Sequence, residues 1–164
     1  MTICGMIVSL ADKIDTLAGD FAVGLIPTGS ADPYALRRQA AGILRIIVEN
    51  NLDISLKQLV NKAFELLPQQ VAPDKQKATE LLSDFFRQRF ETILEEKGFK
   101  FDEIRAVLAS GFEKPVDALR RLEALAAIRK VSDFEPLLTG YKRAANIVKQ
   151  AEQKKILFDT TGAI

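Results

Sequence analysis

The sequence has no histidine and only one cysteine among its 164 residues. Without histidine, the chain can form no imidazole general base, no Ser–His nucleophilic pair and no histidine-bearing metal site. The single cysteine, Cys4, can form neither an internal disulfide nor a structural zinc site by itself, and it indicates a reducing compartment. These absences predict that the chain has no catalytic residue and no metal site of its own.

Long apolar runs and a strong net charge are also missing. No segment approaches the ~20 apolar residues that a membrane-spanning helix needs. The first apolar stretch has no basic residue before it and soon reaches Asp12, which argues against a signal peptide. A formal net charge of +1 gives no global attraction to nucleic acid or membrane, so any such binding needs a local patch. We expect a cytoplasmic protein that does not bind membranes.

Helical periodicity is what the sequence does contain. Apolar residues make up 48% of the chain and recur at i, i+3 and i+4 almost throughout, while strand patterns are nearly absent. The predicted fold class is therefore all-α. Helices are expected to begin near residues 7, 33, 56, 75, 102, 115, 133 and 141. Gly19 is expected to weaken the first of them, Gly98 to end the one that begins near 75, and Gly140 to precede the last. The stretch Pro68–Pro73 predicts a boundary between two helical modules.

Four residues have the character of helix caps. Three of them precede a predicted helix: Ser55, followed by Gln58, then Asp74, and Ser132, followed by Glu135. In "LIPTGSADPYALRR", Asp32 is expected to cap a helix whose first residue is Pro33, and Gly29 supplies a tight bend before it.

The same stretch places Arg37 and Arg38 next to each other on the first turn of that helix. Adjacent helical residues point about 100° apart, so at most one of the two can face the core. The other is free for a phosphate or for a carboxylate partner. Because an arginine near a helix N-terminus opposes the helix dipole, its position hints at a specific role.

The helix expected after Asp74 carries the heaviest apolar face of the protein. The residues of this face are Leu82, Phe85, Phe86, Phe90, Ile93 and Leu94. We interpret them as core residues. The alternative is that one of the three phenylalanines is exposed and stacks on a nucleobase.

Basic charge is concentrated late in the chain. Residues 114–149 contain eight basic and four acidic residues, a net charge of +4. Lys142, Asn146 and Lys149 follow an i, i+4, i+7 spacing and share one helix face opposite the apolar positions. Such a cationic ridge suits a phosphate backbone, and the amide can hydrogen-bond a base or sugar edge. Two other interpretations stay open: a solvated helix face, and an Asn146 that is buried against a loop.

Several stretches together resemble one family. "SLADKIDTLAG", "GLIPTGSADPYALRRQAAGILRI", "FFRQRFETILEEKGFKFDEIRAVLAS" and "YKRAANIV" resemble, in this order, the C-terminal portion of the β subunit of bacterial glycyl-tRNA synthetase. The resemblance extends from about Ser9 to Val148, and the loop with its following arginines is the most specific part.

This resemblance implies a domain organisation and a division of labour. Residues 1–68 would be the end of an HD-like helical domain, 69–74 a linker, and 75–164 a helical bundle similar to the anticodon-binding domain of arginyl-tRNA synthetases. The α subunit of this enzyme carries the class II catalytic core, with ATP and Mg²⁺. This chain is then expected to hold no cofactor and to have the tRNA for glycine and the α subunit as partners. The hypothetical tRNA-contacting residues are Arg37, Arg38, Arg120, Arg121, Lys142, Arg143, Asn146 and Lys149.

The resemblance also bears on two aspartates. Asp12, in "ADKID", stands at the position of the last metal-binding aspartate of HD phosphohydrolases, but it cannot hold a catalytic metal alone, and a surface carboxylate is the simpler interpretation. Asp20 stands where a small or apolar residue is expected. Two other functions remain as alternatives: a remnant of an HD-type phosphohydrolase, which would need upstream histidines and a divalent metal, and a helical module that docks on the α subunit.

Overall fold

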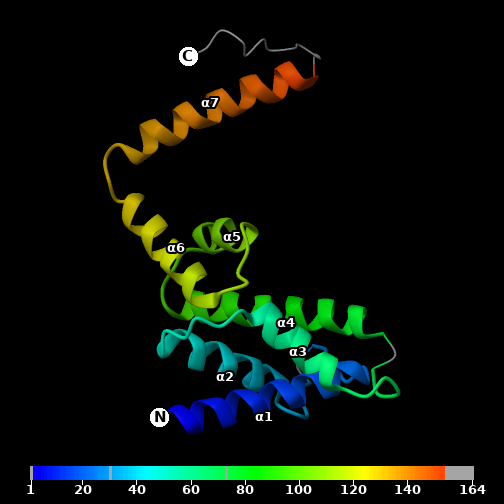
Figure 1. The fold of residues 1–164 in the computed structure, drawn as a ribbon. Helices are drawn as coiled ribbons and strands as arrows, with labels where there is room; N and C mark the ends of the chain where they lie inside the picture. Colours follow the sequence, from blue (N-terminus) through cyan, green and yellow to red (C-terminus); the bar gives the residue numbers. More distant parts are fainter. Residues whose placement is uncertain (1, 30, 73, 154–164) are drawn as a thin grey trace. The chain divides into compact units, whose positions relative to one another are not determined.

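The computed structural model describes residues 2–29, 31–72 and 74–153, and within these ranges it contains helices and no strand. This confirms the predicted all-α class. The helices are α1 (Ile3–Ala22), α2 (Leu36–Glu49), α3 (Leu56–Leu66), α4 (Lys75–Glu96), α5 (Phe101–Ala109), α6 (Pro115–Ile128) and α7 (Phe134–Gln153), as labelled in Figure 1.

The chain divides into two compact units, Met1–Ala124 and Leu125–Ile164. Unit 1 contains α1 to α5 and most of α6, and unit 2 contains the end of α6 and α7. The predicted domains at 1–68 and 75–164 stay a prediction. In the structure, α4, which follows the expected linker at 69–74, packs on α1, α2 and α3 within unit 1. Helices α3 and α4 thus belong to the same unit.

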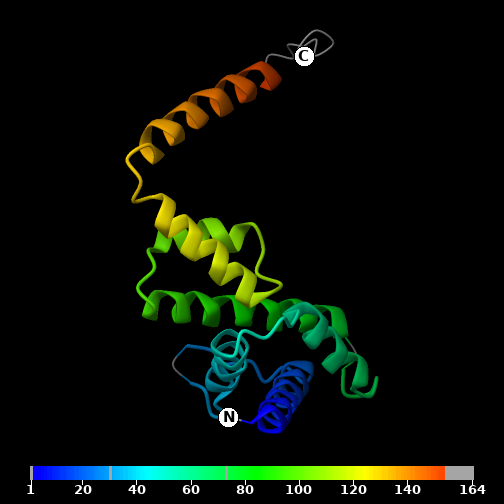
Figure 2. The same cartoon turned by 60° about the vertical axis from the view of Figure 1, so that its left-hand side comes forward.

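Helix α4 forms the centre of unit 1. It packs against α1, α2 and α3, with α5 on its other side, as Figures 1 and 2 show. Its predicted apolar face is buried as expected: Phe86 and Phe90 are fully buried and Phe85 is only 7% exposed. The ring of Phe85 lies 5.2 Å, centroid to centroid, from that of Phe21 on α1. None of the three phenylalanines of α4 is therefore available as a base-stacking platform.

Two of the four predicted caps are confirmed, those of Ser55 and Asp74. The hydroxyl of Ser55 accepts a hydrogen bond from the backbone N–H of Gln58 (3.1 Å) at the start of α3. The carboxylate of Asp74 accepts one from the N–H of Lys77 (3.1 Å) at the start of α4. Each cap satisfies an N–H group that has no partner inside its helix.

The expected helix start at Pro33 is wrong. Helix α2 begins at Leu36, because Ala35 adopts a left-handed conformation with φ of 56° and interrupts the helical backbone. Asp32 still caps the helix from four residues away, through hydrogen bonds described below. Gly29 does form the expected bend, with φ of +55°.

The expected helix start after Gly140 is wrong, and Gly19, which is expected only to weaken its helix, does not end it. Gly19 lies inside α1 and Gly140 inside α7. A glycine costs only about 1 kcal/mol in a helix interior, and favourable neighbours can offset that cost. Gly98 does end α4, and its φ of +89° is the left-handed conformation typical of such an end.

None of the described helices is long and apolar enough to cross a membrane.

Candidate nucleic-acid interface

Arg37 holds the loop that precedes α2. Its guanidinium donates hydrogen bonds to the carbonyl oxygens of Gly29 (2.7 Å, from Nη2) and Ala31 (3.3 Å, from Nη1). The carboxylate of Asp32 accepts hydrogen bonds from the backbone N–H groups of Leu36 (2.8 Å) and Arg37 (3.1 Å). The guanidinium of Arg37 and the carboxylate of Asp32 thus join the loop to the first turn of α2. The role of Arg37 in tRNA binding stays a prediction, and two nitrogens of its guanidinium already donate hydrogen bonds to this loop.

Arg38 has the opposite environment. It is exposed on the first turn of α2, while the buried residues of that helix, such as Leu36 and Ala40, lie on another face. Within the part of the chain that the structure describes, no hydrogen bond or ion pair engages its guanidinium. Of the two adjacent arginines, Arg38 is thus the one whose guanidinium has no partner among the described residues, and its role in tRNA binding stays a prediction.

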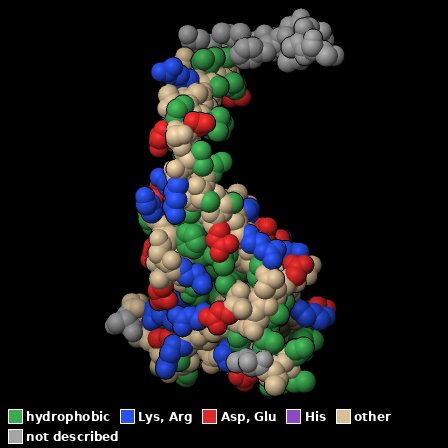
Figure 3. All heavy atoms as spheres, turned by 90° about the vertical axis from the view of Figure 1, so that its left-hand side faces the viewer, with side chains coloured by type: hydrophobic (Ala, Val, Ile, Leu, Met, Phe, Trp, Pro, Cys, Tyr) green, Lys and Arg blue, Asp and Glu red, His purple; other side chains and the backbone are tan. Residues whose placement is uncertain are grey.

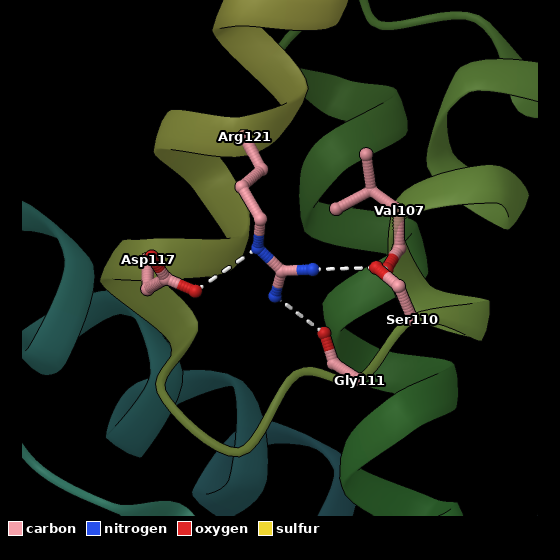
Figure 4. A network of polar contacts seen from close by, with 5 residues as sticks. All are labelled: Val107, Ser110, Gly111, Asp117 and Arg121. Carbon is pink, nitrogen blue, oxygen red and sulfur yellow. Dashed lines mark hydrogen bonds and ion pairs between the residues drawn. The ribbon is translucent and has the colours of Figure 1, made fainter. Parts of the chain in front are cut away.

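Arg121 connects α6 to the end of α5, as Figure 4 shows. Its Nε donates to the carboxylate of Asp117 (2.9 Å), Nη1 to the hydroxyl of Ser110, and Nη2 to the carbonyl oxygen of Gly111 (2.6 Å). The Ser110 hydroxyl in turn donates to the carbonyl oxygen of Val107 (2.8 Å). All three guanidinium nitrogens are thus used inside the protein, in a network that closes the α5–α6 connection.

Arg120 and Lys114 each contact a residue in the connection between α2 and α3. Arg120 donates from Nη2 to the amide oxygen of Asn51 (2.8 Å), a residue in the left-handed conformation with φ of 52°. Lys114 forms an ion pair with Asp53, with 2.9 Å between Nζ and Oδ1. The hydrogen bond and charge of the Asp53 carboxylate raise the pKa of Lys114 above its ordinary value. These pairs join residues more than 50 positions apart, which a spacing pattern cannot reveal.

The two arginine pairs do not form one patch. Arg37 and Arg38 lie on the first turn of α2, whereas Arg120 contacts Asn51, just beyond the last turn. A helix of 14 residues is about 20 Å long at 1.5 Å per residue, so this length separates them. Figure 3 shows basic and acidic side chains interspersed over the face that it draws.

Helix α7 presents the predicted ridge to solvent. Lys142, Arg143, Asn146 and Lys149 are all exposed, and none of them has a hydrogen bond or an ion pair to another described residue. The helical spacing keeps Lys142, Asn146 and Lys149 on one face, with Arg143 further round. The interpretation of Asn146 as a buried residue is wrong for the described structure. Contact with RNA is compatible with this geometry and stays a prediction.

The two aspartates singled out in α1 differ in environment. Asp12 is an exposed surface carboxylate, and the described residues contain no cluster of three or more acidic or cysteine side chains that could hold a metal ion. Asp20 is half-buried in the last turn of α1, and burial raises the pKa of its carboxyl above the ordinary 3.8. The residue is thus placed against the preference of a carboxylate for water, as its departure from the expected small or apolar type suggested.

Tyr34 is a surface residue that the sequence reasoning did not single out. It lies between Pro33 and Ala35, is 54% exposed, and belongs to the loop that Arg37 holds from the first turn of α2. Its signal in the sequence is weak, because the only mark it carries is that it is one of two tyrosines in the chain.

Comparison with known proteins identifies relatives over most of the chain. A family model described as glycyl-tRNA synthetase beta subunit matches residues 1–109. The glycine–tRNA ligase beta subunit of Syntrophotalea carbinolica is 47% identical over 148 residues, which are 88% of this chain and 21% of the relative. That of Desulforamulus reducens is 40% identical over 157 residues, 94% of this chain and 23% of the relative.

The beta subunit of Moorella thermoacetica is 46% identical over 156 residues, 93% of this chain and 22% of the relative. The chain thus spans about a fifth of the length of these relatives. The family model covers the loop before α2 with Arg37 and Arg38 and ends before the ridge on α7.

Proposed function

The chain belongs to the glycyl-tRNA synthetase β-subunit family, and from this membership we propose that it acts in tRNA recognition during glycyl-tRNA synthesis. The proposal keeps the predicted placement in the C-terminal portion of the subunit, with an HD-like domain end before residue 69 and an anticodon-binding-like bundle after residue 74. The sequence motifs that resemble this portion support it. The partners are the tRNA for glycine and the α subunit, which supplies the chemistry with ATP and Mg²⁺.

The observation that carries the proposal is the exposed ridge of Lys142, Asn146 and Lys149 on α7. Two ammonium groups seven positions apart on one helix face lie about 10 Å from each other along the axis. They can neutralise phosphates of one backbone while the amide between them reaches a base or sugar edge. Because no described side chain competes for these three residues, an RNA can bind them without breaking an internal pair.

The test is a titration of the protein with the tRNA for glycine at several salt concentrations. Each phosphate contact that is lost should reduce the slope of log affinity against log salt by about one unit. We therefore expect Lys142→Ala and Lys149→Ala each to flatten the slope without unfolding the protein. Lys77→Ala, which removes an exposed lysine from α4, is the matched control and should leave the slope unchanged. An affinity that is equal at low and high salt would contradict the proposal.

Asn146→Ala separates base recognition from phosphate binding. If the amide reads a base edge, its loss should narrow the gap between the tRNA for glycine and other tRNAs by ~1–3 kcal/mol, while the salt slope is retained. An unchanged gap with an unchanged melting temperature would assign Asn146 to the solvated surface.

We expect the purified chain to show no glycine-dependent ATP–pyrophosphate exchange, since it has no histidine and the resemblance assigns catalysis to the α subunit. Exchange by the pure chain would overturn this division of labour.

A second function is favoured by a separate observation. The apolar residues Leu137, Tyr141 and Val148 of α7 are 67%, 70% and 50% exposed. They form a stripe on the face of α7 away from the ridge, which suits a helical module that docks on the α subunit. Tyr141→Ser should then weaken association with the α subunit and leave tRNA affinity unchanged. The reverse result would favour the RNA function alone.

A further inference from the structure

The loop between α1 and α2 lines a small apolar pocket that is open to solvent. Its volume is about 200 Å³, and the residues that give it its apolar character are Leu25, Ile26, Pro27, Pro33, Tyr34 and Leu36. Ligand pockets for drug-sized molecules usually measure ~300–1,000 Å³, whereas one water molecule occupies about 30 Å³. The pocket is thus of a size for one planar ring system and too small for a helix or a strand.

Hydrogen bonds tie described parts of this loop to the first turn of α2. Arg37 binds the carbonyl oxygens of Gly29 and Ala31, and Asp32 binds the first N–H groups of α2. Residues that such bonds already hold lose less conformational entropy when a ligand binds beside them. Because the carboxylate of Asp32 occupies the N-terminus of α2, that terminus is not a free anion site, and a ligand must be recognised by other groups.

Two groups at the rim remain in water. Tyr34, which lines the pocket, is 54% exposed, and Leu25 on the same pocket is 43% exposed. Arg38, four residues after Tyr34, is the cation of this region without a partner among the described residues. An exposed aromatic ring with a free arginine nearby is the combination with which proteins bind unpaired nucleotides, since the ring stacks on the base and the guanidinium binds the phosphate.

We propose that this loop holds one unstacked nucleobase of an RNA against Tyr34, while Arg38 binds an adjacent phosphate. The proposal rests on the proposed function, because the RNA is the tRNA that the protein recognises. It adds a site that lies in unit 1 and is separate from the ridge on α7. Arg37 is a positioning residue of this site, because it shapes the loop and leaves the ligand to Tyr34 and Arg38.

The test uses the fact that the chain has two tyrosines and no tryptophan. In a Tyr141→Phe background, tyrosine fluorescence reports Tyr34 alone. We expect the emission to be quenched when the tRNA for glycine is added, because the base stacks on the ring. Tyr34→Ala should weaken tRNA binding roughly 5- to 150-fold. Tyr34→Phe, which keeps a ring, should bind like the wild type.

Two further variants complete the design. Phe101→Ala removes another exposed aromatic ring from unit 1, 61% exposed on α5, and should leave tRNA affinity unchanged. Arg38→Ala should reduce the salt slope of binding by about one unit, as expected for one lost phosphate contact. The melting temperature of each variant shows whether a loss of affinity comes from unfolding.

The outcomes separate this proposal from the proposed function. If tRNA binds the wild type while Tyr34→Ala keeps full affinity and the emission of Tyr34 is not quenched, the loop site is wrong and the tRNA function stands. If tRNA does not bind, a single-stranded RNA oligonucleotide is used instead: quenching of Tyr34 supports the loop site without the tRNA function, and its absence overturns both. If Tyr34→Ala weakens only the association with the α subunit, the pocket holds a protein side chain and the proposal is also overturned.

Discussion

Replacing Arg121 by alanine distinguishes a structural arginine from one that contacts RNA. In the structure all three nitrogens of its guanidinium donate hydrogen bonds to residues of α6 and of the α5–α6 connection. Its side chain is 36% exposed and that of Asp117 is 61% exposed, so their ion pair by itself is worth only about 0–1 kcal/mol. The bonds to Ser110 and Gly111 involve a charged donor, and each such bond contributes about 1.5–3 kcal/mol where it is shielded from water.

Because Arg121 is partly in water, we reduce this sum and expect Arg121→Ala to cost about 1–3 kcal/mol of the free energy of unfolding. For a chain of this length, each kcal/mol lowers the melting temperature by about 2–4 °C, so the expected fall is about 2–12 °C. Thermal unfolding followed by circular dichroism measures it. Arg38→Ala is the matched control: an exposed arginine without a partner among the described residues, whose loss should change stability by less than about 0.5 kcal/mol.

A double-mutant cycle assigns the stabilisation to the network of Figure 4. Arg121→Ala and Ser110→Ala should be coupled by more than 0.5 kcal/mol, since each removes the same hydrogen bond. An Arg121→Ala protein that melts at the wild-type temperature and binds tRNA with a flatter salt slope would refute this reasoning, because the arginine would then contact phosphate.

Phe86→Ala and Phe90→Ala should each lower the free energy of unfolding by ~3–5 kcal/mol, measured by urea denaturation, because both rings are fully buried in the centre of unit 1; a small change would mean that the core of α4 is loosely packed. Asp20→Asn should raise the melting temperature at pH 7, because burial raises the pKa of Asp20 in the folded state and makes its ionised form unfavourable there. The contribution of the protonated Asp20 to wild-type stability is present at low pH and is lost as the pH rises from about 3.8 through the raised folded pKa. The difference in melting temperature between the asparagine variant and the wild type should therefore shrink on acidification. A difference that grows on acidification would show that burial is not the cause.

Features that depend only on residues close in the sequence, such as the buried face of α4 and two helix caps, could be predicted. The apolar spacing located α4 and its buried face, and the caps at Ser55 and Asp74 act on N–H groups three residues later. The exception is α2, whose start moved from Pro33 to Leu36. A left-handed alanine is rare, so nothing in the local pattern indicates that Ala35 interrupts the helix.

Features that depend on distant residues could not be predicted. The hydrogen bond from Arg120 to Asn51 spans 69 positions, the one from Ser55 to Glu113 spans 58, and the ion pair of Arg45 with Glu96 spans 51. A charge count treats each of these arginines as available for a ligand, because it contains no information on which acceptors the fold brings close.

Whether a basic side chain bonds other residues of the protein depends on how close it lies to carbonyl groups that have no partner within a helix. Arg37 and Arg121 lie near loops whose carbonyl oxygens have no helical partner, and a planar guanidinium with five donors can bridge several such oxygens at once. Lys142 lies in the middle of α7, where the surrounding carbonyl groups are bound within the helix, so its ammonium has no local acceptor. Basic residues in the interior of exposed helices are therefore better candidates for phosphate contacts than arginines beside loops, and in this chain that criterion favours the ridge on α7 over the arginines of α6.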